Sequence, residues 1–68
     1  MSKYLIRIYD HNIKTNYIER VFEADDRLDV IQKAKHDNDI LREASGKLST
    51  KDSVETVIDK GSYEITEL

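Results

Sequence analysis

The side chains best suited to chemistry in this chain are two histidines and the acidic residues near them. His36 and Asp39 are three residues apart, so on a helix they would share one face and could offer two ligands to a metal ion. His11 lies far away in the sequence, in a predicted turn. Asp37 and Asp39 are spaced like the start of a calcium loop, but Arg42 stands where such a loop needs glycine. We therefore predict no metal site.

Groups that could carry out catalysis are also sparse. The chain has no cysteine, and no serine stands in a Gly-x-Ser-x-Gly elbow. Gly46-Lys47 and Gly61-Ser62 are isolated pairs, and neither belongs to a phosphate-binding loop. A chain of 68 residues also has little interior volume for a substrate pocket. We therefore predict a protein that is not an enzyme, with no catalytic residues, no cofactor and no small-molecule substrate.

Tyrosines and basic residues alternate near the N-terminus. Residues 1–22 carry four basic and two acidic side chains, whereas residues 23–68 carry seven basic and twelve acidic ones. A basic surface with aromatic rings can stack on bases and hold phosphates, so nucleic-acid binding is one hypothesis. Tyrosines at alternate strand positions are also common in ordinary sheet packing, and the net charge of the whole chain is −3. The acidic remainder is interspersed with lysine and arginine, which disfavours mimicry of DNA.

The first two strands are predicted by apolar residues that alternate along residues 3–24. Residues 3–9 are largely apolar on both faces, which is typical of a central strand. Asp10 and Asn12 favour a turn over residues 10–14, and residues 15–24 form the return strand. Ile18, Phe22 and Ala24 fall on one face of that strand, with Arg20 between them, and we assign this face to the core.

The apolar spacing becomes helical after Asp25 and Asp26, either of which can cap the helix. One helix over residues 27–45 is favoured, ending at Gly46 as its C′ residue. The alternative is a break near Asn38, with a second helix that starts at Asp39, because residues 36–39 are poor helix formers.

The C-terminal third is predicted to form a second hairpin. Residues 47–53 are polar and form a loop, and the β-branched residues of Val54–Asp59 predict a strand. Residues 59–62 are a turn in which Gly61 supplies a positive φ, and residues 63–68 form the last strand. The expected core is Ile6, Ile8, Phe22, Val30, Ile31, Ala34, Leu41 and Ile65.

These elements predict a single α+β domain over residues 1–68. We expect a four-stranded, mainly antiparallel sheet, built as β-hairpin, helix and β-hairpin, with one helix packed on one face. One helix cannot cover both apolar faces of residues 3–9. The other face, and the exposed strand edges, are therefore expected to meet a partner.

The predicted function is a small, non-enzymatic protein-interaction module that binds a partner protein, or a second copy of itself, through its sheet. The alternative is a nucleic-acid-binding module that uses the N-terminal hairpin. Short length with many isoleucines and lysines is typical of accessory proteins of phages or mobile elements in AT-rich bacteria. With no long apolar segment and no apolar leader, a cytoplasmic location is expected. The candidate partner-binding residues are Leu5, Arg7, Tyr9, Ile13, Tyr17 and Arg20.

Overall fold

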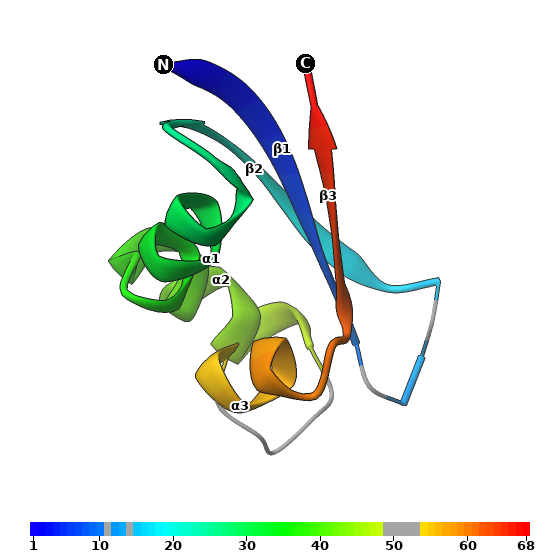
Figure 1. Ribbon diagram of the computed structural model, residues 1–68. Helices are drawn as coiled ribbons and strands as arrows, with labels where there is room; N and C mark the ends of the chain where they lie inside the picture. Colours follow the sequence, from blue (N-terminus) through cyan, green and yellow to red (C-terminus); the bar gives the residue numbers. More distant parts are fainter. Residues whose placement is uncertain (11, 14, 49–53) are drawn as a thin grey trace.

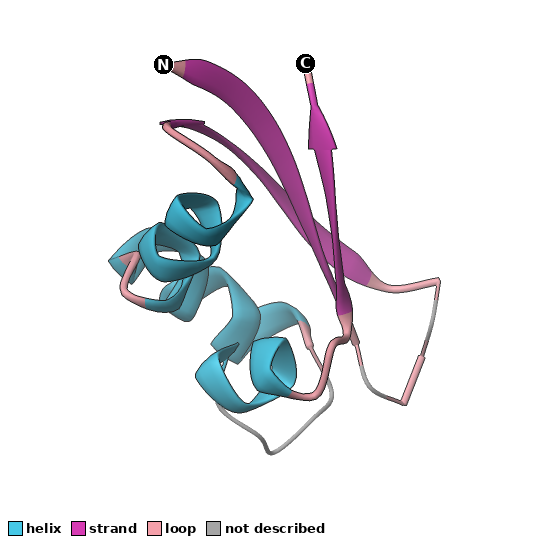
Figure 2. Ribbon diagram, in the orientation of Figure 1, coloured by secondary structure: helices cyan, strands magenta, loops and turns pink. Residues whose placement is uncertain are grey.

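The computed structural model describes residues 1–10, 12–13, 15–48 and 54–68. Its elements form a three-stranded sheet and three helices, all packed on one side of the sheet (Figures 1 and 2). In chain order they are β1 (Ser2–Tyr9), β2 (Tyr17–Ala24), α1 (Arg27–Lys35), α2 (Asn38–Lys47), α3 (Val54–Asp59) and β3 (Tyr63–Glu67).

The sheet has the order β2-β1-β3, and both pairs of strands are antiparallel. The central position predicted for β1 is confirmed. Ile6 sits opposite Arg20 of β2 and opposite Ile65 of β3, so all three side chains share one face. The α+β class and the antiparallel sheet are confirmed, but the sheet has three strands among the described residues and not the four that the sequence predicted.

The core lies between the sheet and the helices. Tyr4, Ile6 and Ile8 of β1 point into it, because alternate side chains of a strand point to the same face. Of the expected core residues, Phe22 and Ile31 are only partly buried against the cluster. The buried apolar residues are Tyr4, Ile6, Ile8, Ile18, Ala24, Val30, Ala34, Ile40, Ala44, Leu48, Val54, Val57, Ile58 and Ile65.

The segment Val54–Asp59 forms the short helix α3, so the prediction of a strand there is wrong. Val54, Val57 and Ile58 are all buried, and their spacing of three and four residues places them on one side of a helical turn. Helix propensities of β-branched residues are lower than that of alanine by only about 0.7 kcal/mol or less each, which burial of three side chains easily outweighs.

The single helix favoured for residues 27–45 is also wrong, because the chain breaks between α1 and α2. The Asp37 carboxylate accepts a hydrogen bond from the Ile40 N–H at 2.9 Å and so starts a new helix. The alternative of a break is confirmed, with α2 starting at Asn38, one residue before the predicted start. The break changes the helical phase, so Ile40 is buried and Leu41, which was assigned to the core, is exposed.

Of the two predicted helix caps, the aspartate cap at the start of α1 is present and the glycine cap at Gly46 is not. At the start of α1, the Asp26 carboxylate accepts from the Asp29 N–H at 2.9 Å, as predicted for a capping residue. The Asp29 carboxylate in turn accepts from the Asp25 N–H, which lowers the pKa of Asp29. Gly46 was predicted to end the helix, but it lies inside α2, where the buried Leu48 extends the packed face beyond it.

The two glycines differ in what their backbone requires. Gly61 has a φ of +80° and closes α3, since its N–H donates to the Ile58 carbonyl while the Ser62 N–H donates to Val57. We expect Gly61→Ala to lower the free energy of unfolding by about 1 kcal/mol and Gly46→Ala to raise it by about 0.5–1 kcal/mol. An added Cβ at Gly46 meets no atom within 4 Å. Urea unfolding of the two variants checks this, and equal signs would contradict it.

Candidate functional site

The face of the sheet turned away from the helices is not covered by any described element. Figure 2 shows all three helices on the other side. We call this surface the open face. It is defined by the outward side chains of the three strands, which are Lys3, Leu5, Arg7, Tyr9, Tyr17, Glu19, Val21, Glu23, Glu64 and Thr66.

A charged and aromatic cluster occupies one half of the open face. The Arg7 guanidinium donates to the Glu19 carboxylate at 3.2 Å, and its central carbon lies 4.5 Å from the centre of the Tyr17 ring. The Tyr17 ring meets the Tyr9 ring edge-on, with 5.8 Å between their centres. The Tyr9 hydroxyl donates to the Glu64 carboxylate at 3.0 Å. The five side chains thus link all three strands across the face.

The cluster keeps Arg7 charged and fixed. Hydrogen bonding to Tyr9 and to Glu19 raises the pKa of the Arg7 guanidinium above its ordinary value. The stacking on Tyr17 adds a cation–π contact on one side of the guanidinium. Arg7 is therefore a permanent positive charge held between two carboxylates, Glu19 and Glu64, which lie opposite it on the neighbouring strands.

An apolar row crosses the other half of the open face. Leu5 lies opposite Val21 of β2 and opposite Thr66 of β3. Cross-strand neighbours on one face have Cβ atoms only about 5 Å apart, so these three side chains form a continuous strip. Val21 is 54% exposed, a high value for a valine in a strand. This strip has no cover from any described part of the protein.

The predicted partner-binding residues do not all come together. Leu5, Arg7, Tyr9 and Tyr17 share the open face. Arg20 lies on the helix side, where its guanidinium pairs with Glu43 of α2 and donates to the Glu19 carbonyl at 2.8 Å. Ile13 is in the loop between β1 and β2 and is 48% exposed. Arg20 therefore does not share the open face with the four other strand residues, because successive strand residues point to opposite faces.

Six open-face residues were not among the predicted ones, namely Lys3, Glu19, Val21, Glu23, Glu64 and Thr66. The period-two pattern of residues 15–24 already put Val21 on the side of Tyr17, so the sequence carried that signal. Glu64 and Thr66 could be found only after β3 was known to pair with β1 in the observed register.

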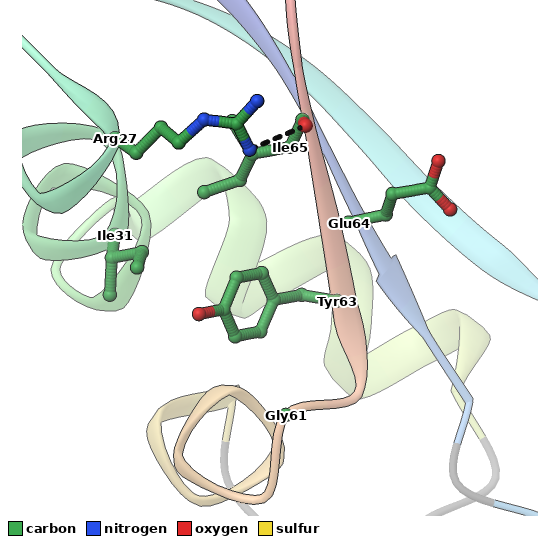
Figure 3. A pocket seen from close by; sticks show the side chains of 6 residues that line it. All are labelled: Arg27, Ile31, Gly61, Tyr63, Glu64 and Ile65. Carbon is green, nitrogen blue, oxygen red and sulfur yellow. Dashed lines mark hydrogen bonds between the residues drawn. The ribbon is translucent and has the colours of Figure 1, made fainter.

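A second surface feature lies between α1 and the helix-facing side of β3 (Figure 3). It is an open depression of about 400 Å³, lined by Ile31, Tyr63 and Ile65 together with Arg27, Gly61 and Glu64. The Arg27 guanidinium donates to the Ile65 carbonyl at 3.1 Å across its rim. In Figure 3 the Glu64 carboxylate points away to the other side of β3. The depression can therefore hold an apolar side chain and offer a cationic donor beside it.

Metal ligation finds no support in the described part of the chain, where no three histidine or acidic residues come together. His36 ends α1 and Asp39 belongs to α2, so the break removes the shared helical face that the sequence suggested. His11 lies outside the described residues. None of the described helices is long and apolar enough to cross a membrane.

Comparisons with known proteins give no functional assignment, so any proposed function rests on these surfaces. No protein-family model matches the chain, and no curated protein and no solved structure was found that is significantly similar to it.

Proposed function

We propose that this protein is a small, non-enzymatic protein-interaction module that binds a partner protein through the open face of its sheet. The observation that carries the proposal is the pairing of an uncovered apolar strip, Leu5–Val21–Thr66, with a fixed Arg–Tyr–Tyr cluster on the same face. Arginine and tyrosine are enriched among the residues that contribute most to protein–protein binding.

The internal contacts of the cluster support this role. Arg7, Tyr9 and Tyr17 are already half-buried and held by one another and by Glu19 and Glu64. Immobilising a long side chain on binding costs about 0.5–1.5 kcal/mol, and side chains that are fixed beforehand avoid much of this cost. A partner that lies on the face therefore meets a surface that is already ordered.

The charges of the open face suggest the chemistry of the partner. Glu19, Glu23 and Glu64 outnumber Lys3 and Arg7, so the face carries a net charge of 2 − 3 = −1. A fitting partner surface has an apolar centre, to cover Leu5 and Val21, and basic residues at its rim.

The alternative, nucleic-acid binding, receives less support from the geometry. It requires a continuous positive strip, but Arg7 is paired with Glu19 and Arg20 is paired with Glu43 on the opposite side of the sheet. Among the described residues, the open face therefore offers carboxylates where phosphates would have to lie. Gel-shift assays with DNA and RNA at low salt are expected to show no complex at tens of micromolar protein.

The test compares partner capture by the wild-type protein and by variants of the open face. Val21→Arg and Leu5→Arg put a charge into the apolar strip, and each should weaken binding of the captured partner at least about tenfold. Leu28→Arg is the matched control, because Leu28 is 65% exposed but lies on α1, in the helix layer. The partners are identified by mass spectrometry, and affinities are then measured with the purified partner.

Two results would count against the open face. One is a partner that binds Val21→Arg and Leu5→Arg as tightly as the wild type. The other is a partner that is lost only with Leu28→Arg, which would move the binding site to the helix layer. Thermal unfolding of each variant establishes that the protein is still folded.

A further inference from the structure

The outer edge of β3 presents backbone groups to solvent. The Tyr9 N–H donates to the Ser62 carbonyl and the Leu68 N–H donates to the Lys3 carbonyl, each at 2.9 Å. The N–H and C=O groups of successive residues point to opposite edges of a strand, so the N–H and C=O groups of Glu64 and Thr66 also face β1. The N–H and C=O groups of Tyr63, Ile65 and Glu67 therefore point away from the sheet. Among the described residues, their one recorded partner is Arg27, at the Ile65 carbonyl.

The space beside this edge is open on the helix side as well. Helices α1 and α2 pack mainly over β2, and α1 and α3 also contact β1, so the helix layer lies mainly over β2 and β1 and leaves the outer edge of β3 open. The depression between α1 and β3 is the result (Figure 3). An added strand can reach the edge of β3 and place side chains over the depression.

We propose that this edge is occupied by the β3 strand of a second copy of the chain, in an antiparallel pair that joins two three-stranded sheets into one of six strands. A two-fold axis relates the two copies, as in most homodimers. The proposal does not rest on partner binding by the open face, since pairing at the edge leaves that face uncovered.

The sequence of β3 fits itself best in the register that pairs the whole strand. With Ile65 on the axis, all five residues of Tyr63–Glu67 are paired, and Tyr63 lies opposite Glu67 of the second copy. The outward backbone groups then form about six hydrogen bonds between the copies. Glu64 lies opposite Thr66 of the second copy, so no glutamate meets a glutamate. Shifting the axis to Glu64 or to Glu67 would put like charges directly opposite, which is unfavourable.

The other outer strand, β2, lacks this self-complementarity. Its two longest symmetric registers place Arg20 opposite Arg20 of the second copy, or Glu19 opposite Glu23 of the second copy. Two of its outward carbonyls are also taken, because Lys33 donates to the Glu23 carbonyl at 2.6 Å and Arg20 donates to that of Glu19. Charged side chains at the edge of a sheet oppose the addition of a further strand there. The second copy should therefore pair with β3 and not with β2.

Arg27 and Glu67 supply charge complementarity across the axis. Neither takes part in an ion pair within the described residues. In the proposed dimer, the Ile65 carbonyl accepts from Ile65 of the second copy. Arg27 then exchanges that carbonyl for the carboxylate of Glu67 on the neighbouring strand, which lies on the same side of the sheet.

The test measures the protection of each backbone N–H group of β3. Amide hydrogen exchange of the full chain is followed by NMR at about 50 µM and about 1 mM, a range in which a small interface of this kind should assemble. The N–H groups of Tyr63, Ile65 and Glu67 should exchange at least about tenfold more slowly at the higher concentration. Those of Glu64 and Thr66, which already face β1, are internal controls and should not change. Sedimentation equilibrium should show a dimer over the same range.

Variants separate the edge from the rest of the surface. Glu67→Pro removes an outward N–H that would donate to the second copy, so it should abolish the dimer. The variant should still fold, because the ladder between β3 and β1 does not use that N–H. Arg27→Glu and Glu67→Arg should each weaken the dimer about tenfold, and the double variant should restore it. Glu64→Gln is the matched control on the other face of β3 and should leave the dimer intact.

The proposal is overturned if the wild type stays monomeric at about 1 mM, or if the protection that depends on concentration falls on β2 instead of β3. A dimer that is lost with Leu5→Arg but kept with the charge variants of Arg27 and Glu67 would also overturn it, and would point to pairing by the open face. If Glu67→Pro does not fold, the charge reversal and its restoration still decide the question.

Discussion

Ile40→Ala should lower the free energy of unfolding by about 3–4 kcal/mol, whereas Leu41→Ala, one residue later, should lower it by less than about 1 kcal/mol. Ile40 is 0% exposed and belongs to the core cluster, while Leu41 is 38% exposed on the outer side of α2. A buried isoleucine loses its transfer free energy and leaves a cavity when truncated. An exposed leucine loses only part of its transfer free energy and leaves no cavity.

The consequence is large for a chain of this size. A single core in a domain below about 70–80 residues rarely provides more than about 3–5 kcal/mol, so Ile40→Ala should be largely unfolded at 37 °C. Urea unfolding at 25 °C, followed by circular dichroism, measures both variants. Equal losses for the two would show that α2 continues the helical phase of α1, and that the break at Asp37 does not exist in solution.

Asp10→Ala should lower the free energy of unfolding by about 2–3 kcal/mol, although it removes no apolar contact. Asp10 is 1% exposed at the end of β1. Its carboxylate accepts from the N–H groups of Asn12, at 2.8 Å, and Ile13, at 3.3 Å, and from the Asn16 amide at 3.1 Å. The same Asn16 amide nitrogen donates to the Lys47 carbonyl at the end of α2. The variant therefore loosens the loop between β1 and β2 and its link to the helix layer.

Asp10→Asn is the matched control for this prediction. It keeps one acceptor oxygen and nearly the same volume, so it should cost clearly less than Asp10→Ala. Thermal and urea unfolding of both variants measure the difference. A cost for Asp10→Ala within about 0.5 kcal/mol of zero would mean that water replaces the carboxylate without loss, and that the loop is not organised by it.

The hairpin of β1 and β2 and the central place of β1 could be predicted from the sequence, because their signal is local. Period-two alternation in residues 3–9 marks a strand with two largely apolar faces, and β1 is the central strand. Turn chemistry at Asp10, capping at Asp26 and the positive φ of Gly61 also depend on near neighbours, and all three are confirmed. The partner-binding role of the open face stays a proposal, although Leu5, Arg7, Tyr9 and Tyr17 do lie together there.

The wrong predictions fall where the local sequence is compatible with two structures and tertiary packing determines which one forms. Val54–Asp59 has the composition of a strand and the apolar spacing of a helical turn, and burial of Val57 and Ile58 against the sheet selects the helix. Residues 36–39 favour a break in the helix. Where the second helix begins sets its phase, and that phase buries Ile40 in the core and leaves Leu41 exposed. The loop predicted for residues 47–53 lies mostly outside the described residues.

The sequence alone determined the α+β class, the antiparallel hairpin of β1 and β2 and a capping aspartate at the start of α1, because these follow from spacing and from contacts within a few residues. The tertiary structure alone decided the number of strands, the pairing of β1 with β3 and the ion pair of Arg20 with Glu43. It also decided that the helix layer leaves the outer edge of β3 uncovered. These outcomes depend on contacts between residues distant in sequence, whose free energies of burial exceed the local preferences that a sequence displays.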